Sequence, residues 1–189
     1  MALQLEIRRK LIHLTSLSIP IGYSFIDRDT TLVILAGVFV LSLSLEIGRL
    51  FIPRIRSRVH PVFAPIMRVA EERKLSGATY LLAGAWITIY FFEKEIALVG
   101  LLLVSLSDGA AAIVGTAYGK IHLWQKTLEG STAFFASTGL ILIVMMNLSV
   151  EEMLTALFIG TLVELLPIPI NDNLTLPVLT ALAMQSIGS

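Results

Sequence analysis

Long apolar runs alternate with short polar stretches along the chain, and this pattern predicts a bundle of membrane-spanning helices. A helix needs roughly 20 apolar residues to cross the hydrocarbon layer, and about seven runs approach that length. Several runs are shorter, so we expect little tilt and some helix ends at the interface. The predicted helices cover residues 10–25, 30–51, 77–92, 95–118, 131–148, 151–166 and 174–188. We therefore expect an all-α, polytopic transmembrane bundle.

A basic stretch at residues 54–74 separates the second apolar run from the third. Its prolines and its spacing of Ile, Val, Phe and Met predict a kinked amphipathic helix on the membrane surface. Two roles stay open for it: a topology anchor beside anionic head groups, and direct contact with a substrate. No internal repeat or low-complexity segment is evident, so we expect residues 1–189 to form a single domain.

The composition favours a membrane protein and removes some kinds of chemistry. Hydrophobic residues make up 56% of the 189 positions and charged residues 15%, whereas soluble domains carry about 25% charged residues. The formal net charge is zero, so charge names no partner class, and we expect no nucleic-acid ligand. Because the chain has no cysteine, disulfides, thiolate metal sites and a cysteine nucleophile are excluded.

Arginine and lysine set the predicted orientation of the bundle. No small-x-small cleavage pattern follows the first apolar run, so we expect a retained helix and not a signal peptide. With the N-terminus in the cytoplasm, the outer loops hold only Arg28 and Lys94. The inner loops then hold Arg8, Arg9, Lys10, Arg49, Arg54, Arg56, Arg58, Arg68, Arg73, Lys74, Lys120 and Lys126. The positive-inside rule therefore predicts a cytoplasmic N-terminus and an outer C-terminus.

The rare polar side chains of the apolar runs gather at one predicted end of the bundle. Helices of opposite direction place these groups at or near their cytoplasmic ends, whereas the outer loops are short and plain. The residues concerned are His13, Glu46, Asp108, Glu129, Glu164, Asp172 and Asn173. We expect a site that faces the cytoplasm, where nucleotide and Mg²⁺ are available, beside apolar helices that give access to a lipid.

Asp108 is the strongest single candidate for a functional residue. A carboxylate within the bilayer costs a few kcal/mol or more and is usually functional. Mg²⁺ is typically held by one or two carboxylates together with substrate phosphates, which suits this position. The alternative is an interhelical ion pair that only fixes packing.

Gly115, Gly119 and Lys120 follow Asp108 and suit close approach of the backbone to phosphate. They do not form a P-loop, because three residues separate the glycines and Ile121 follows the lysine. The two glycines also fit small-x-x-x-small helix packing, which stays open as their role. The polar segment that continues through Lys126, Thr127, Glu129 and Gly130 favours phosphate contact.

Glu164 and Asp172 form a second polar cluster, and we predict that they assist Asp108 as metal ligands. Glu129 is a further candidate ligand. Asp172 and Asn173 also suit the N-cap of the last helix, and that role alone would explain Asn173.

Arg9 and Lys10 lie close to His13, and arginine suits bidentate phosphate recognition, so we predict triphosphate contacts here. Alternatively, Arg9 and Lys10 only set topology and His13 caps or packs. Glu46, with Arg49 three residues later, is either a functional acid or one half of a helix-end ion pair.

Together these residues suit phosphoryl transfer, which needs a metal, cationic groups on the phosphates and an aligned nucleophile. The sequence lacks a Ser-His-Asp arrangement and an H-E-x-x-H zinc motif. It also lacks helices rich enough in charge for an obvious ion path.

Five motifs follow one another along nearly the whole chain. They are R-K-x-x-H from Arg9, S-G-x-x-Y from Ser76, S-D-G-x-A-x-x-x-G-x-x-x-G-K from Ser107, K-T-x-E-G-S from Lys126, and Glu164 with Asp172-Asn173. In order and spacing the chain resembles the CTP-dependent lipid-alcohol kinases. That group includes dolichol kinase, phytol kinase and the yeast-type diacylglycerol kinase.

This resemblance implies an integral membrane enzyme that moves the γ-phosphate of CTP, with a divalent cation such as Mg²⁺, onto a lipid hydroxyl. Arg9, Lys10, Asp108 and Gly115 match positions that the family needs for activity. We expect Asp108, Lys10 and Asp172 to be catalytic, with Asp108 or Asp172 accepting the hydroxyl proton. The expected nucleotide contacts are Arg9, Lys10, His13, Gly115, Gly119, Lys120, Lys126, Thr127, Glu129 and Gly130.

The short chain suits a prokaryotic plasma membrane enzyme with its site on the cytoplasmic face and a polyprenol, dolichol or geranylgeraniol acceptor. Phytol and diacylglycerol stay open as alternative acceptors. The oligomeric state also stays open, with a homo-oligomer as one alternative. The family is also similar to the CTP:phosphatidate cytidylyltransferases, which make CDP-lipids, but the ending at residues 164–173 lacks their pattern. A small transporter is a further alternative, although carriers place acids at midplane in repeated halves.

Overall fold

The computed structural model describes residues 13–63, 72–145 and 147–188, and its elements are almost all helical. The first half holds η1 (Leu14–Leu17), α2 (Ser18–Phe25), α3 (Arg28–Phe51), α4 (Pro53–Phe63) and α5 (Gly77–Phe91). The second half holds α6 (Lys94–Leu102), the π-helical turn η3 (Leu103–Ser107), α7 (Asp108–Tyr118), α8 (Leu128–Val144), α9 (Val150–Leu165) and α10 (Asp172–Gly188). Each predicted apolar run is helical over most of the part that the structure describes, but α8 ends at Val144, four residues before the predicted end at residue 148.

The length of the helices supports a membrane bundle. Among the described residues, Arg28–Phe51 and the continuous run Lys94–Tyr118 are long and apolar enough to cross a membrane. Gly77–Phe91 and Leu128–Val144 are shorter apolar helices. The number of seven spans and the cytoplasmic N-terminus stay predictions.

One short β-hairpin interrupts the helices, where the sequence predicted only a polar loop. Strand β1 (His122–Leu123) pairs antiparallel with β2 (Lys126–Thr127), and His122 lies opposite Thr127. Trp124, in the turn, has a φ of 55°, a left-handed conformation that is uncommon for a large residue. The hairpin reverses the chain so that β2 leads directly into α8.

Helix α10 occupies the centre of the bundle, because two glycines let neighbouring backbones come close to it. A Cβ at Gly84 of α5 would lie 2.6 Å from the carbonyl oxygen of Asn173. A Cβ at Gly100 of α6 would lie 2.8 Å from the carbonyl oxygen of Pro177. Either side chain would force the helices apart, so glycine permits this packing.

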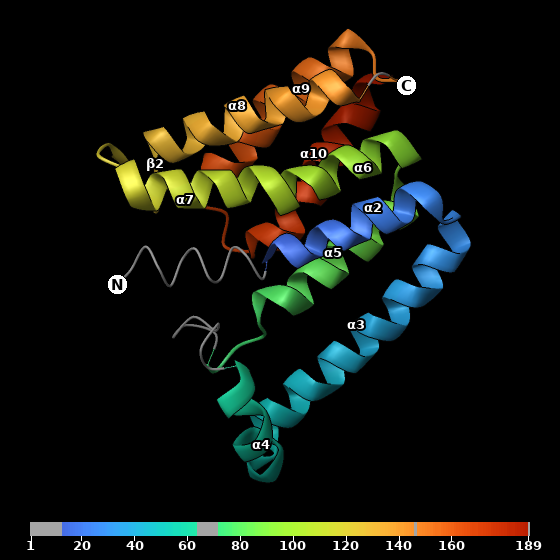
Figure 1. Cartoon of the computed structure of the whole chain (residues 1–189), viewed down its shortest axis with the longest axis vertical. Coiled ribbons are helices and arrows are strands. Elements are labelled where there is room, and N and C mark those ends of the chain that lie inside the picture. Colours follow the sequence, from blue (N-terminus) through green and yellow to red (C-terminus); the bar gives the residue numbers. More distant parts are fainter. Residues whose placement is uncertain (1–12, 64–71, 146, 189) are drawn as a thin grey trace.

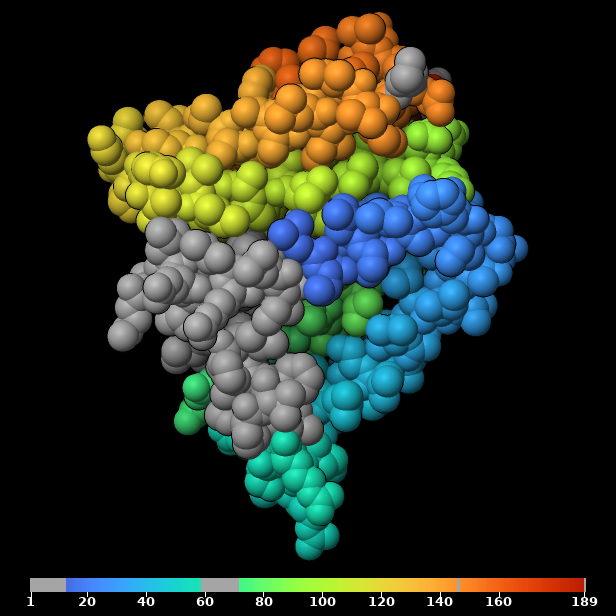
Figure 2. Space-filling view, viewed as in Figure 1, coloured from blue at the N-terminus to red at the C-terminus, as the bar shows by residue number. Residues whose placement is uncertain are grey.

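Helix α3 diverges from the rest of the bundle. Figure 1 shows α6, α7, α8 and α9 running side by side, while α3 slants away from α2 toward α4. Helix α3 keeps contact with α5, where Ser42 Oγ lies 3.1 Å from Thr79 Oγ1. Figure 2 shows a hollow between α2 and α3 with α5 behind it. The bundle is therefore closed on the side of α8 and α9 and open on the side of α3.

Candidate active site

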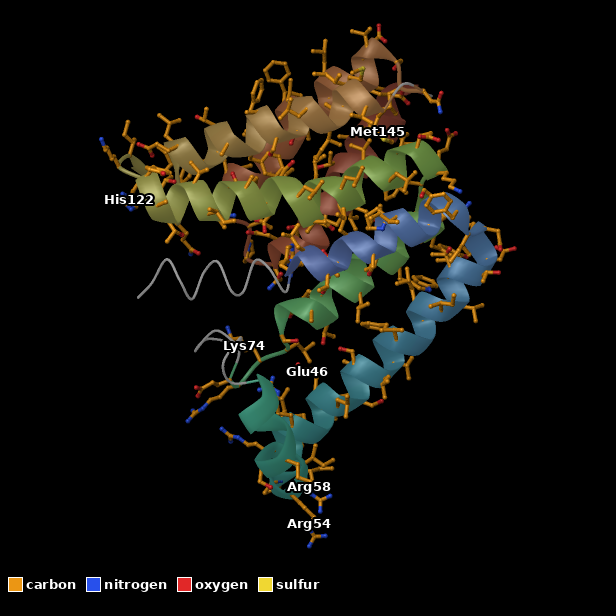
Figure 3. The ribbon with its side chains drawn as sticks, viewed as in Figure 1. Glu46, Arg54, Arg58, Lys74, His122 and Met145 are labelled. Carbon is orange, nitrogen blue, oxygen red and sulfur yellow. The ribbon has the colours of Figure 1, made fainter. Side chains whose placement is uncertain are left out.

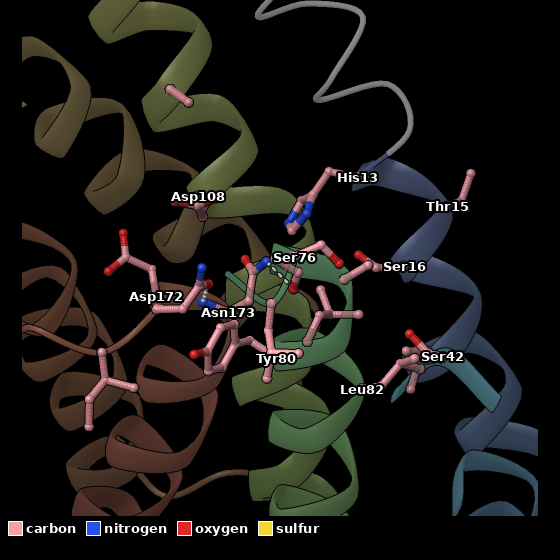
Figure 4. A pocket seen from close by; sticks show the side chains of 18 of the residues that line it. His13, Thr15, Ser16, Ser42, Ser76, Tyr80, Leu82, Asp108, Asp172 and Asn173 are labelled. Atoms are coloured by element: carbon pink, nitrogen blue, oxygen red, sulfur yellow. Dashed lines mark hydrogen bonds between the residues drawn. The ribbon is translucent and has the colours of Figure 1, made fainter. Parts of the chain in front are cut away.

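A cavity of about 1420 Å³ extends between α2, α3, α5, α7, α8, α9 and α10. Its walls differ in character along its length. Polar residues that line one end include Asp108, Lys126, Thr127, Glu164, Asp172 and Asn173. Apolar residues that line the other end include Ile19, Leu35, Val38, Leu81 and Leu82. Figure 4 shows how Asp108 of α7 and the neighbouring Asp172 and Asn173 of α10 face the same space.

Lys126 is the cation at the centre of the polar end. Its Nζ lies 2.8 Å from Oδ2 of Asp172 and 3.2 Å from Oε1 of Glu164. Burial alone would lower the pKa of Lys126, but the negative charges of Asp108, Asp172 and Glu164 outweigh it and raise the pKa. The lysine therefore stays protonated and holds together acids from three helices.

Glu164 is the most buried acid of this cluster, with 3% of its side chain exposed. Its Oε1 faces Lys126, and its Oε2 accepts a hydrogen bond of 2.9 Å from the Ser131 hydroxyl. A buried carboxylate needs such partners, because desolvation otherwise costs several kcal/mol. Ser131, which comes from α8, is the last residue of the K-T-x-E-G-S motif, but its contact with Glu164 was not predicted from the sequence.

Asp108 begins α7 directly after the π-helical turn and is 7% exposed. Isolated π-turns within α-helices occur often at functional sites. Here two residues of the segment at η1 contact the turn. His13 Nε2 donates a hydrogen bond of 2.8 Å to the Val104 carbonyl, and Ser16 lies 2.9 Å from Ser105, hydroxyl to hydroxyl. His13 therefore holds the helix that carries Asp108, and it also lines the cavity.

The start of α10 corrects one prediction. The sequence suggested Asp172 and Asn173 as the N-cap, but the Asn171 side chain accepts the hydrogen bond, at 3.0 Å from the Asn173 amide. This cap leaves the Asp172 carboxylate for Lys126. The Asn173 amide group donates a 2.8 Å hydrogen bond to the Gly77 carbonyl, which ties α10 to the start of α5.

Three glycines pack the hairpin and α8 against α7. A Cβ at Gly115 would lie 2.7 Å from Thr127 Oγ1, and one at Gly119 would lie 2.6 Å from Thr127 Cγ2. A Cβ at Gly130 would lie 2.9 Å from the Ala111 carbonyl oxygen. Thr127 Oγ1 also accepts the Gly130 amide hydrogen bond and so caps α8. This geometry accounts for the glycines through packing, although Gly115 and Gly130 also line the cavity.

Lys120 and Glu129 are not among the residues that line the cavity. The Glu129 carboxylate accepts a hydrogen bond of 3.3 Å from the Ile121 amide and is exposed to solvent. Hydrogen bonds from its own amide and from that of Lys120 lower the pKa of Glu129. The structure therefore places this acid at the hairpin and apart from Asp108, where it closes the loop.

Glu46 forms a helix-end ion pair with Arg49, which is one of the two roles that the sequence suggested for it. Arg49 is 2% exposed, and its Nη2 lies 2.5 Å from Oε2 of Glu46. The same guanidinium donates to the carbonyls of Glu72, at 3.1 Å, and Lys74, at 2.8 Å. The pair thus fastens the segment before α5 to the end of α3, and Figure 3 shows Glu46 and Lys74 on facing segments.

The structure describes only some of the basic residues that the sequence suggested as phosphate or substrate contacts. Arg9 and Lys10 lie outside the described residues. Arg54 and Arg58 are exposed on α4 and are not among the residues that line the cavity, and Figure 3 shows them at the tip of the molecule. Of the predicted phosphate contacts, Lys126 is the lysine that the structure brings to Asp108, Glu164 and Asp172.

The donor set suits a magnesium ion that is shared with phosphate. Within the described residues, no group of three or more His, Asp and Glu side chains could hold a metal ion by itself. Mg²⁺ typically takes one or two carboxylates and completes its shell with phosphate oxygens and water. Asp108 and Asp172, which both line the cavity, fit that smaller set.

Comparisons with known proteins give several relatives. An uncharacterized protein of Rickettsia prowazekii, RP860, is 29% identical over 182 residues, 91% of this chain and 89% of that protein. CTP-dependent diacylglycerol kinase 1 of Eremothecium gossypii is 33% identical over 138 residues, 69% of this chain and 43% of that kinase. Dolichol kinase of Saccharomyces cerevisiae is 28% identical over 193 aligned residues, 93% of this chain and 36% of that kinase.

The chain therefore spans less than half the length of these two kinases. No family model matches the sequence. No solved structure matches it.

Proposed function

We propose that this chain transfers the γ-phosphate of CTP to the hydroxyl of a membrane lipid alcohol. The chain belongs to the CTP-dependent lipid kinase family, and the proposal follows from that membership. The observation that carries the proposal is the cavity, in which the acids Asp108, Glu164 and Asp172 surround Lys126 at one end while apolar helices line the other. A donor with several phosphates and an acceptor with a long hydrocarbon chain need these two environments side by side.

The triphosphate of CTP is proposed to lie at the polar end of the cavity. Lys126 is the cation placed to receive it, together with the predicted contacts Arg9, Lys10 and Lys120. A lysine ammonium is a compact charge that binds phosphate without demanding one geometry. Binding would draw Lys126 from Asp172 toward the phosphates, because Asp172 is the more exposed of its two acidic partners.

Asp108 and Asp172 would hold Mg²⁺ when the nucleotide is bound, with Glu164 behind them. The ion supplies positive charge to the phosphate oxygens, which is the main electrostatic need of phosphoryl transfer. Glu164 is engaged by Ser131 and Lys126, so its part is to position Lys126.

In the proposed reaction the lipid hydroxyl oxygen forms a bond to the γ-phosphorus as the bond from that phosphorus to the bridging oxygen breaks. CDP leaves with the electron pair of the broken bond. The hydroxyl proton passes to Asp108 or Asp172, both of which line the cavity. The chain's contribution is to align the hydroxyl and to stabilise charge, as phosphoryl transfer requires.

The acceptor is proposed to be a polyprenol or dolichol-type alcohol, with geranylgeraniol, phytol and diacylglycerol as the other members of the class. The protein is proposed to be integral to a prokaryotic plasma membrane, with its site on the cytoplasmic face. Two apolar helices long enough to cross a membrane support membrane association.

Labelled CTP tests this proposal. Purified protein in detergent is incubated with a polyprenol or diacylglycerol and with CTP labelled on either the γ- or the α-phosphate. A kinase gives lipid label only from γ-labelled CTP. Label from α-labelled CTP would mean a CDP-lipid synthase, and label from neither would contradict both enzymes.

A further inference from the structure

The apolar end of the cavity has walls from three helices. Ile19 and Gly22 face it from α2, Leu35 and Val38 from α3, and Leu82 from α5. Figure 2 shows the hollow between α2 and α3, and Figure 4 shows Leu82 and Ser42 on its walls. We refer to this space between α2, α3 and α5 as the lateral cleft.

Two hydroxyl groups on the walls of the lateral cleft already have hydrogen-bond partners and do not need a polar ligand. Ser42 Oγ lies 3.1 Å from Thr79 Oγ1, so these two hydroxyls pair with each other across the helices. The Thr31 hydroxyl donates a 2.8 Å hydrogen bond to the Asp27 carbonyl. Because Ser42 and Thr31 have partners within the protein, an apolar occupant leaves neither hydroxyl unsatisfied.

Helix α3 is apolar but scarcely covered. In its most apolar stretch of 18 residues, 17% is buried inside the protein, whereas 72% of the corresponding stretch of Lys94–Tyr118 is buried. Ile34, Val38 and Leu45 line the cavity and remain exposed. Their apolar surface is therefore available for contact with hydrocarbon.

We infer that the lateral cleft binds the hydrocarbon chain of the lipid alcohol, with the hydroxyl directed to Asp108 and Lys126. This inference rests on the proposed function and adds the location of the acceptor chain. The cleft is continuous with the acids, and the α3 residues that line it run from Thr31 to Leu45, short of the ion pair of Glu46 and Arg49. At 1.5 Å of rise per residue that stretch is roughly 21 Å long, enough for a long chain. A nucleotide would leave these walls unused, and a chain without a polar head would leave the acids unused.

Gly22 is the residue at which the inference is tested most sharply. It lines the cleft, and a Cβ there would meet nothing within 4 Å, so a larger side chain fills the cleft without a backbone clash. Gly37 of α3 provides a matched control. A Cβ there also meets nothing within 4 Å, but Gly37 is not among the residues that line the cavity.

The first experiment compares Gly22→Leu and Gly37→Leu with a long-chain and a short-chain form of the same alcohol, a prenol or a diacylglycerol. Gly22→Leu is expected to lower the ratio of kcat/KM for long over short acceptor by roughly tenfold or more. Gly37→Leu is expected to leave the ratio at its original value. Equal ratios in all three proteins would overturn the inference.

The second experiment needs no turnover and therefore separates this inference from the proposed function. The protein is photolabelled in detergent with a diazirine-bearing prenol or diacylglycerol, or with diazirine-bearing phosphatidylcholine, and the labelled peptides are mapped. Alcohol label on the cleft faces of α2, α3 and α5, exceeding that of phosphatidylcholine, supports the inference. Equal label from both probes, or alcohol label on outward faces, overturns it even if γ-phosphate transfer is observed.

Discussion

The Lys126 ammonium lies 2.8 Å from the Asp172 carboxylate, although 46 positions separate these residues in the chain. The contact joins the hairpin to the start of α10. Since Glu164 shares the same ammonium at 3.2 Å, removal of Lys126 should change both stability and activity, and these effects can be measured apart.

Lys126→Met should lower the stability of the protein by about 2 kcal/mol. Glu164 would remain buried without its cation, but the cost falls below that of a fully buried pair because Lys126 is 25% exposed. Phosphate transfer should fall at least about 100-fold, the usual loss when one electrostatic group is removed. Thermal unfolding in detergent and the transfer assay report the two effects.

The control for this variant is the double substitution Lys126→Met with Glu164→Gln. The neutral amide removes the unpaired charge and keeps the shape, so stability should recover while transfer stays low. If the double variant is no more stable than Lys126→Met, Glu164 is not the group that Lys126 stabilises.

Gly115→Ala should destabilise the contact between α7 and the hairpin, because its Cβ would lie 2.7 Å from Thr127 Oγ1. The oxygen cannot move freely, since it also caps α8. We expect a loss of about 1–3 kcal/mol, as for other overpacked sites. A lower Tm measures this loss.

Gly109→Ala is the matched control, because a Cβ at Gly109 of the same helix meets nothing within 4 Å. Its Tm should stay the same or rise. If Gly115→Ala keeps its Tm and only weakens CTP binding, the glycine contacts phosphate and does not serve packing.

Arg49→Met should destabilise the protein by about 3 kcal/mol, because it leaves Glu46 and the carbonyls of Glu72 and Lys74 without a shared donor. Arg49→Lys should be intermediate, since one ammonium does not span all three acceptors. Glu46→Gln should lower Tm with little change in KM for CTP. A large rise in that KM at unchanged Tm would instead make Glu46 a nucleotide contact.

The stabilising effect of Lys126 should be independent of pH from about pH 7 to about pH 9. Its folded pKa is raised above the unfolded value of about 10.4. Such a contribution is complete below the unfolded pKa and is lost only as pH rises through the higher folded pKa. The difference in Tm between wild type and Lys126→Met tests this, and a difference that shrinks from pH 7 to pH 9 would be inconsistent with it.

Local sequence patterns were enough to predict the helices but not how they lie. The apolar runs placed helix ends within a few residues, because caps such as Asp27 and Ser149 act locally. The divergence of α3 is not visible in the sequence. The most apolar stretches of Arg28–Phe51 and Lys94–Tyr118 have the same mean hydropathy of 2.1. Burial depends on neighbours that the pattern of one helix does not specify.

The sequence predicted the grouping of residues in the candidate site where a residue's chemistry is unusual for its surroundings. Acids in apolar runs identified Asp108 and Glu164, and the structure brings both near Lys126. The pairing of Ser131 with Glu164 joins residues far apart in the chain and has no local signal, although Ser131 belongs to the K-T-x-E-G-S motif. Glu129 stays a predicted ligand, although its carboxylate accepts a hydrogen bond from the Ile121 amide in the hairpin segment.

Asp108→Asn provides the most direct test of the central claim. The substitution keeps the shape of the side chain and removes the charge, so the fold should remain and transfer of label from γ-labelled CTP to lipid should fall at least about 100-fold. Asp29→Asn is the control, because Asp29 is exposed in the first turn of α3 and is not among the residues that line the cavity. Near-normal transfer by Asp108→Asn, with Asp29→Asn behaving the same, would contradict a role for Asp108 in the reaction.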